Sequence, residues 1–590
     1  MKKIYGILKK ITLCTILGAT VVSCDLDVVP PSDIAAETFW QNEKDAWSNL
    51  NAIYSNTMPG IGIYGDTYTE DVYCQYSWES SGMFFVVDGF NSGYDSGWNF
   101  ESVRKANLFL KEVDNCTMND DLKARFKAEA RFMRALSYLG LTVTFGKVPL
   151  ITDVLAYNAP NVPRDEVSTV RKFVLDELTE AAKILPVKYN GGYLNEYGRV
   201  TKYAALAVKA RAALLFGDYA TAEATAKDII DNGGYSLYRI SELTETQKKE
   251  ADEMSQYVDF AALGIDKDKF VKGMFSYESL WINDTNNPEN IMTRQYTASS
   301  VDYEDGVRYT NMRPNQMGGW SSVTPTQSLV NAYWTTDGKS APQLPTTDER
   351  KAAYEKIKAA LSAYLKENDD NSFESFVATK LASGELKNYD YIKEFRNRDA
   401  RMYASILMPF KGWYETDMSD SYAYEWIKGG NNESKTGFNF RKMVALSDPN
   451  DSGQAATDFP CIRYAEVLLI YAEARTQTTG YDAEVRKQLN DIRDRCGMPD
   501  VPESLSKDEA LNFIRQERRI ELAGEGNRGD DVTRYESSYW EKCMNNVSLT
   551  APDGEVILTM KWSDRMRLRP LPTTAMDMNP LLKDDQNPGY

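Results

Sequence analysis

Residues 198–230 read GRVTKYAALAVKARAALLFGDYATAEATAKDII, and this stretch decides the fold class. Small apolar residues recur at helical spacing through 199–216, and a second helical pattern follows from Asp218 to Ile230 after a short turn. A helix-turn-helix of this kind is typical of tetratricopeptide repeats, which bury a continuous core by stacking on one another. The stretch therefore predicts a mainly α fold of tetratricopeptide-like helical repeats.

The helical pattern recurs on both sides of this pair. Within residues 121–145, the apolar residues Phe126, Phe132, Leu136 and Leu139 return at helical spacing. A proline follows two of the expected helices and favours their termination. Besides the pair in 198–230, we expect helices around 36–57, 121–145, 167–185, 346–383, 462–477, 482–495 and 507–523.

Two stretches differ from this pattern. Residues 241–340 and 384–460 are rich in turn formers and aromatics, and no helical period lasts long in them. We expect loops and short strands there, laid on the helices. Composition never shifts sharply enough to mark a linker, so the sequence predicts a single domain over 36–590. Its expected parts are helical repeats over about 36–235, a loop-rich ligand part over about 241–460, and C-terminal helices with a tail over 461–590.

Composition excludes several classes of function. The chain has 590 residues, 68 Lys plus Arg, 86 Asp plus Glu and a net charge of −18. An acidic body repels phosphate backbones, so no nucleic-acid partner is expected. Histidine is absent, which excludes Ser-His-Asp triads, Cys-His pairs and H-E-x-x-H zinc sites. No cofactor or metal centre is predicted, and only catalysis by paired carboxylates stays open.

The N-terminus carries the pattern of a lipoprotein signal. Lysines open the chain, an apolar run of 12 residues extends from Ile11 to Val22, and Ser23 and Cys24 follow. The run is too short to span a bilayer but suits the core of a signal peptide. We predict a signal peptide over 1–23, lipidation of Cys24 and an extended lipidated tether over 24–35. The alternative is an ordinary signal followed by a chance cysteine.

Two short motifs point to other functions and are set aside. Residues 60–65, GIGIYG, match G-x-G-x-x-G, but a nucleotide site needs a strand before the motif and a helix after it. Here a predicted helix and Pro59 come before it. Residues 448–453 begin like an EF-hand loop, but its twelfth position is Phe459 instead of Glu. A calcium ion at this acidic loop stays an open alternative.

Eight motifs run in one order along the chain, and together they resemble the SusD/RagB family of outer-membrane nutrient-uptake lipoproteins. Ala400 departs from the family pattern, which usually has proline there. The motifs are the lipobox at Cys24, Trp98–Phe100, Lys127–Ala135 with Phe145–Leu150, Gly198–Lys202, Asn397–Arg401, Ile462–Leu469 with Tyr471–Ala474, Glu517–Leu522 with Glu525–Arg528, and Asn579–Pro580 with Gln586–Tyr590.

The resemblance implies a SusD-like α-helical fold on four tetratricopeptide-like units. It implies an outer-membrane lipoprotein that faces the cell exterior, binds an oligosaccharide without cleaving it, and covers a SusC-like TonB-dependent transporter as a lid. Charged residues at helical spacing within the motifs are expected to tie stacked helices together instead of binding ligand. These scaffold residues are Glu129, Arg131, Arg463, Glu466 and Glu473.

A neutral glycan site needs flat aromatic rings flanked by polar side chains, and 12% of the residues are aromatic. Segments 293–296 and 318–321 resemble stretches that carry ligand-stacking aromatics in the starch-binding family member. The predicted ligand-binding residues are Trp320, Tyr296 and Arg294 from these segments, with Trp78, Asp71 and Asp66 from a third wall.

Other aromatics and other functions stay open as alternatives. Trp413, Tyr414, Tyr424 and Trp426 form a second aromatic group that suits either a ligand or a partner interface, and Trp98 is expected in the core. A peptide-binding lid of the same family is the main alternative function. A glycoside hydrolase is the other, because two carboxylates would suffice for it.

Overall fold

The computed structural model describes residues 39–60, 62–94, 97–156, 158–189, 196, 198–282, 287–296, 311–367, 372–413, 423–444 and 457–590. The predicted signal peptide, the lipidated Cys24 and the tether over 24–35 lie outside the described residues. So do the 448–453 loop and Tyr414.

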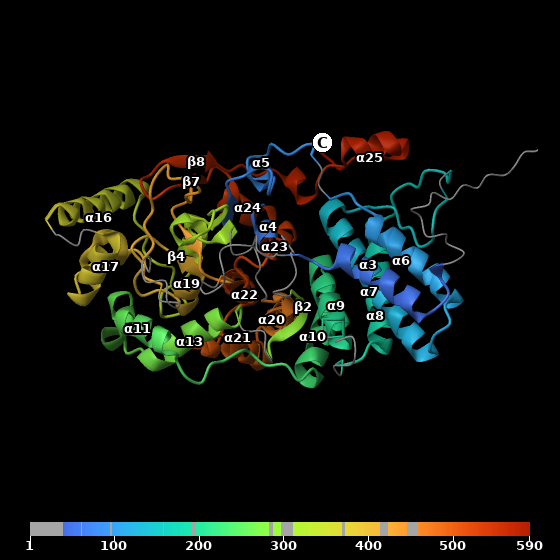
Figure 1. The fold of residues 1–590 in the computed structure, drawn as a ribbon, viewed down its shortest axis with the longest axis horizontal. Helices are drawn as coiled ribbons and strands as arrows, with labels where there is room; N and C mark the ends of the chain where they lie inside the picture. The colour runs from blue at the N-terminus through green and yellow to red at the C-terminus, as the bar shows by residue number, and fades with distance from the viewer. Residues whose placement is uncertain are drawn as a thin grey trace, which may run out of the picture.

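The N-terminal third is a stack of antiparallel helices that gathers at one end of the molecule (Figure 1). Neighbours along the chain pack on one another from α6 to α10, and α3 packs on α6 and α7. One apolar core runs through all six helices. They are α3 (Glu43–Thr57), α6 (Glu101–Glu112), α7 (Asp120–Phe145), α8 (Val167–Ile184), α9 (Lys202–Phe216) and α10 (Tyr219–Asn232).

The stretch 198–230 folds as predicted, into α9 and α10. Thr201 caps α9 by accepting the amide hydrogen of Ala204, and Asp218 caps α10 in the same way through Thr221. Between them Gly217 adopts a left-handed conformation with φ of 78°. Asn42 forms a capping box immediately before Glu43, where α3 begins; the expected helix start near residue 36 lies outside the described residues.

The C-terminal helices continue this stack, although residues 233–463 separate them from it in sequence. Helix α20 packs against both α9 and α10, and α21 and α22 pack on α20. Val467 and Tyr471 of α20 belong to the same apolar core as the N-terminal helices. In Figure 1 these helices lie at the centre of the molecule. Their bounds are α20 (Tyr464–Thr478), α21 (Ala483–Arg495) and α22 (Lys507–Glu521).

The segment between the two groups of helices holds a second, larger apolar core. Its charged helices α16 (Thr347–Glu367) and α17 (Phe373–Ala382) confirm the helical prediction for 346–383. The expectation of loops and short strands over 241–340 is only partly right, because this range contains the short strands β2 (Asn290–Arg294) and β3 (Val323–Pro325) but also helices. They are α11 (Glu245–Glu253), α12 (Phe260–Leu263), α13 (Lys267–Ser279) and α15 (Gln327–Ala332).

The strands described are short and form four antiparallel pairs, each of which joins distant parts of the chain or closes a hairpin. They are β1 (Val72–Cys74) with β3 (Val323–Pro325), β2 (Asn290–Arg294) with β6 (Phe459–Arg463), β4 (Ile406–Leu407) with β5 (Asn439–Phe440), and β7 (Ser548–Thr550) with β8 (Val556–Thr559).

Short helices connect these elements, and the C-terminal tail is also partly helical. The short α-helices are α4 (Ile63–Asp66), α5 (Gly82–Phe85), α18 (Asp390–Lys393), α19 (Ala400–Ser405), α23 (Arg528–Thr533), α24 (Ser537–Met544) and α25 (Thr573–Met578). The 3-10 helices are η1 (Val113–Asn115), η2 (Met254–Gln256), η3 (Asn315–Met317), η4 (Leu386–Asn388), η5 (Asp564–Arg567) and η6 (Pro580–Asp585).

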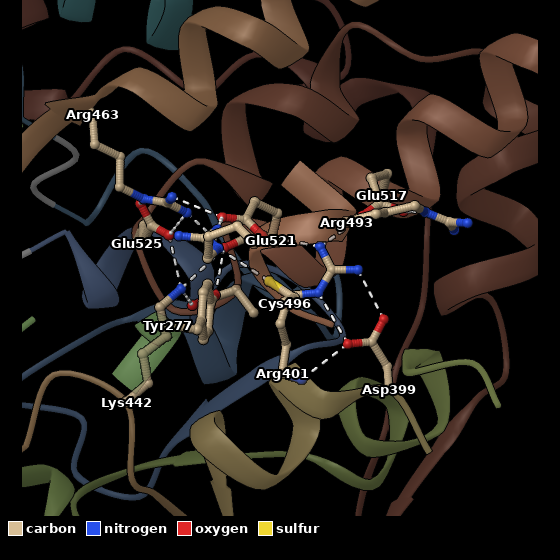
Figure 2. A network of polar contacts seen from close by, with 12 residues as sticks. Tyr277, Asp399, Arg401, Lys442, Arg463, Arg493, Cys496, Glu517, Glu521 and Glu525 are labelled. Atoms are coloured by element: carbon tan, nitrogen blue, oxygen red, sulfur yellow. Dashed lines mark hydrogen bonds and ion pairs between the residues drawn. The ribbon is translucent and has the colours of Figure 1, made fainter. Parts of the chain in front are cut away.

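A buried network of ion pairs joins the C-terminal helices to the central segment, and we call it the junction network (Figure 2). Glu521 of α22 lies at its centre and pairs with Arg401, Arg463 and Arg495, at 2.9 Å and 2.8 Å for the first two. Burial alone would raise the pKa of Glu521, but these guanidiniums hold it well below its usual range. Five cations balance five anions: Arg401, Lys442, Arg463, Arg493 and Arg495 with Glu289, Asp399, Glu517, Glu521 and Glu525.

The charged residues expected in the scaffold are ion-paired. Arg463 belongs to the junction network, and Glu466 pairs with Arg211 at 2.6 Å. Glu129 and Glu473 are also buried and ion-paired. Arg131 is more exposed but pairs with Glu177 at 3.0 Å. These contacts confirm the predicted role of the five residues in holding elements together.

Candidate functional site

The ribbon formed by β1 and β3 brings two distant loops together. Cys74 pairs with Val323 in antiparallel register, so the residues after Cys74 lie beside those that precede Val323. The amide nitrogen of Gln75 donates to the carbonyl of Ser322 at 2.9 Å. We call residues 75–79 and 318–322, at this end of the ribbon, the paired-loop surface.

Two tryptophans distinguish this surface. The chain has 11 tryptophans, all among the described residues, and only Trp78 and Trp320 are exposed. Their exposed fractions are 78% and 39%. They are 242 positions apart in the sequence, and the ribbon places both at one of its ends. Because exposing an indole to water is unfavourable, this coincidence indicates a binding surface.

The conformation of the loop fixes the position of Trp320. The amide nitrogen of Ser321 donates to the carbonyl of Arg313 at 3.0 Å, and Ser321 has a φ of 45°, which is unusual for a residue with a side chain. A Cβ on Gly319 would lie 2.1 Å from the same carbonyl, so the loop requires glycine there. Both neighbours of Trp320 are buried, and the indole therefore projects from a tightly anchored turn.

Polar side chains surround and connect the two tryptophans. The amide of Gln75 donates to the carbonyls of Ser321 and Trp320 at 2.8 and 3.3 Å, and so ties one loop to the other. The ring of Tyr76 stacks on Trp78 with centroids 4.6 Å apart, and its hydroxyl donates to Asn432 at 2.9 Å. An aromatic stack flanked by amides has the chemistry that binds the apolar face and the hydroxyls of a sugar.

The structure corrects the predicted ligand-binding roles of Asp66 and Asp71, since both side chains are almost completely buried. Asp66 accepts the backbone amide hydrogens of Gly526 and Arg528 at 3.2 and 2.9 Å. Burial raises its pKa to about 7. Asp71 is held by the guanidinium of Arg519. Both carboxylates join the N-terminal segment to the C-terminal helices instead of facing a ligand.

Tyr296 and Arg294 do not join the two tryptophans. Tyr296 is 7% exposed and packs in the central apolar core. It therefore offers little ring surface to a ligand. Arg294 lines a different cleft, of about 870 Å³, between α3, Arg199 and β2. Of the six predicted ligand residues, the structure places Trp78 and Trp320 together.

The alternative aromatic group is part of the core. Trp413, Tyr424 and Trp426 are at most 4% exposed, and the ring nitrogen of Trp426 donates to the carbonyl of Ser434 at 2.8 Å. The described members of this group therefore form neither a ligand platform nor a partner interface. Trp98, which was expected in the core, is partly buried against the N-terminal helical core.

The glycines of the 60–65 motif serve backbone packing. A Cβ on Gly62 would lie 2.2 Å from the carbonyl oxygen of Glu525, and one on Gly65 would lie 2.9 Å from that of Gly526. The two segments therefore touch backbone to backbone, which glycine alone permits. Within the described residues, no cluster of three or more metal-ligating side chains is found.

The comparisons with known proteins agree with this fold. The model of the SusD family matches residues 288–590, which is more than half of the chain. The chain belongs to the SusD family, also called SusD/RagB. A second family model, described as "Starch-binding associating with outer membrane", matches residues 26–214. None of the described helices is both long and apolar enough to cross a membrane.

Individual members of the SusD family resemble the chain over nearly its whole length. The SusD-like protein P38 of Formosa agariphila is 25% identical, with 90% of this chain and 92% of that protein covered. A SusD-like protein of Bacteroides fragilis has a TM-score of 0.72 at 24% identity, with 94% and 98% covered. A SusD-like carbohydrate-binding protein of the same species has a TM-score of 0.67 at 22% identity, with 92% and 100% covered.

Sequence reasoning missed Gln75, Tyr76 and Asn432. No motif marks these residues, because their roles depend on the pairing of β1 with β3 and on a contact across 356 positions between Tyr76 and Asn432. The aromatic spacing of Tyr76 and Trp78 was the one local feature that could have indicated them.

Proposed function

We propose that this protein captures a glycan at the paired-loop surface and passes it on for uptake. The observation that carries the proposal is the meeting of both exposed tryptophans, Trp78 and Trp320, at one end of one ribbon. Two rings with fixed positions offer sugar faces a large area with little conformational entropy to lose. The carbohydrate binding stated for one SusD-like neighbour supports the same ligand class.

We propose further that the protein is anchored by a lipid on Cys24 to the outer membrane and faces the cell exterior. The lipobox at Cys24 and a family description that names the outer membrane support this location. The partner proposed is a SusC-like TonB-dependent transporter, for which the protein acts as a lid. Cys24→Ala should release the protein from membranes, and retention of this variant would contradict the anchor.

The proposed function is binding without bond cleavage. Three amides, Gln75, Asn315 and Asn432, lie in or contact the two loops. Glycoside hydrolysis requires two carboxyl groups on either side of the scissile bond. Glu79, the one carboxylate in the two loops, accepts a hydrogen bond from Asn311 at 3.0 Å.

The test is calorimetric titration of the soluble form, residues 25–590, with purified oligosaccharides and polysaccharides. Trp78→Ala and Trp320→Ala should each weaken binding by at least about tenfold, as for buried aromatic anchors in other complexes. Met578→Ala is the matched control, since Met578 is 77% exposed and lies on α25, outside the two loops. Binding that survives both tryptophan variants, or products of glycan cleavage, would contradict the proposal. Binding of peptides alone would favour a peptide-binding lid.

A further inference from the structure

A second concave site lies between the N-terminal helices and the C-terminal segment. A cleft of about 610 Å³ is bounded by side chains of α7, α8 and α9 on one side and by α23, η5 and the chain end on the other. This volume lies within the roughly 300–1,000 Å³ of small-molecule sites. A smaller adjoining pocket of about 80 Å³ shares Val143, Asp530, Thr533 and Arg567 with it. We call the two together the arginine cleft.

The arginine cleft is rich in arginine, in a strongly acidic protein. Its lining contains five arginines and two acidic residues, whereas the chain as a whole has a net charge of −18. Glu473 and Asp88 neutralise Arg534 and Arg565, and Asp564 pairs with Arg567. Arg171 and Arg569 therefore carry the positive charge that a concave surface can focus on an anion. The arginines are Arg171, Arg534, Arg565, Arg567 and Arg569, and the acids are Asp530 and Asp564.

Two of these arginines form no ion pair among the described residues, although Arg569 is close enough to Asp530 to act on it electrostatically. Arg171 stacks on Phe216, with its guanidinium carbon 4.9 Å from the ring centroid, and its buried Nε makes no hydrogen bond there. Burial lowers the pKa of Arg171. Arg569 stacks on Tyr68 at 4.1 Å. In the described parts of the chain, its side chain makes no hydrogen bond or ion pair either.

The remaining arginines of the cleft have hydrogen-bond or ion-pair partners within the protein. Arg565 pairs with Asp88 at 2.7 Å, and Arg567 donates to two backbone carbonyls at 2.7 and 2.6 Å. Because buried polar groups are normally hydrogen-bonded, the buried Nε of Arg171 is poised for a ligand that supplies an oxyanion, and the partly exposed guanidinium of Arg569 can bind one as well.

We propose that the arginine cleft is a second ligand site, which binds the carboxylate or sulfate of an acidic sugar. Arg171 lines the larger cleft and Arg569 the smaller adjoining pocket, and each guanidinium matches an oxyanion. The carboxylate of Asp530, which lines both, can accept hydrogen bonds from sugar hydroxyls. Val143, Leu215 and Leu568 provide an apolar wall for the C–H face of the ring. The proposal extends glycan capture to charged glycans and rests on the proposed function.

An acidic peptide fits these walls less well. The carboxylates of the peptide would lie beside the like charges of Asp530 and Asp564. A peptide also has few hydroxyls that could donate hydrogen bonds to these two aspartates. A sugar acid carries one anion and several hydroxyl donors, which is the combination that the lining of arginines and aspartates complements.

The test is titration calorimetry of residues 25–590 at low ionic strength with galacturonic acid, galactose 6-sulfate and galactose. At least one of the two acids should bind, and galactose should not bind in this cleft. Arg171→Gln and Arg569→Gln should each weaken binding of the acids by about tenfold or more, as loss of a charge-assisted hydrogen bond implies. Arg171→Lys retains the positive charge without the planar guanidinium, so it should weaken binding of the acids less. It replaces the Gln variants in the test if they fail to fold.

Arg486→Gln is the matched control, because Arg486 also stacks on an aromatic ring, Tyr481, without an ion pair among the described residues. It should leave the binding of acids unchanged, as should Trp320→Ala, which tests the neutral glycan site independently. Equal binding of galactose and galacturonic acid, or acid binding that Arg171→Gln leaves intact, would overturn the proposal. So would tighter binding of acetyl-aspartyl-leucine amide, which would make the cleft a docking surface for protein.

Discussion

In the junction network, ten charged side chains are buried and each pairs with one of opposite sign, whereas at the paired-loop surface two large aromatic side chains stay exposed. Both regions hold residue types that bind ligands in other proteins. The difference is whether other residues of the protein already serve as binding partners for these side chains. Glu521 has three guanidinium partners, whereas Trp320 has, among the described residues, polar contacts only through its backbone and that of its neighbours.

This contrast also separates the two kinds of arginine in the molecule. Arginines of the junction network neutralise specific carboxylates and lock elements together, so their removal should affect folding. Arg171 and Arg569 of the arginine cleft lack such partners among the described residues, so their removal should affect binding more than folding. Side chains of the same type thus serve structure or recognition according to what surrounds them.

The largest expected effect comes from breaking the junction network at its centre. Glu521→Ala leaves Arg401, Arg463 and Arg495 without a shared carboxylate in a fully buried site. The arginines keep other carboxylate partners, but the network then has one uncompensated buried positive charge. We expect a loss of about 3–5 kcal/mol in the free energy of unfolding, since such a charge is costly. Urea denaturation of the soluble form measures it. Glu503→Ala, at an exposed position, should change the free energy of unfolding by less than about 0.5 kcal/mol. Similar losses in both variants would contradict the stabilising role of the junction network.

A smaller effect on stability should follow from replacing Asp66, the predicted ligand residue that is buried in the structure. Its pKa is raised from 3.8 to about 7 in the folded protein. The folded state therefore binds more protons than the unfolded state between these values, and the contribution to stability is lost as pH rises through 7. Asp66→Asn cannot titrate. The stability of the wild type relative to this variant should fall between pH 4 and pH 8 by a few kcal/mol, at about 1.4 kcal/mol per pKa unit.

Chemical denaturation of both proteins at pH 4, 6 and 8 tests this prediction. A difference in stability that stays constant over this range would show that Asp66 is ionised throughout. Because Asp66 holds the backbone of Gly526 and Arg528, the variant must first be shown to keep its fold by circular dichroism.

The sequence predicted the fold well wherever a helix has one apolar face and clear caps. The pair α9 and α10 follows from its caps at Thr201 and Asp218. Helix α13 could not be found in this way, because residues 273–278 are buried in succession and leave no amphipathic period. Gly273 also interrupts the helical pattern, although it is needed where the helix contacts the backbone of Cys496.

The site was only partly predictable for a different reason. Trp78 and Trp320 stand out by residue type and by their loop positions, but an exposed indole and a buried one look alike in sequence. Asp66 and Asp71 appeared equally suited to a ligand, yet Asp71 meets Arg519, 448 positions away. Pairing over such distances depends on tertiary structure, which the sequence pattern does not show.

The smallest expected effect tests whether Gln75 positions Trp320. Its side chain donates to the carbonyls of Trp320 and Ser321, and both bonds are lost in Gln75→Ala. Since each net hydrogen bond is worth about 1 kcal/mol, glycan affinity should fall by a few-fold, less than in Trp320→Ala. A double-mutant cycle measures the coupling by calorimetry. If Gln75 acts through the indole, Gln75→Ala should have no further effect in the Trp320→Ala background, whereas additive losses would mean that the amide contacts the glycan itself.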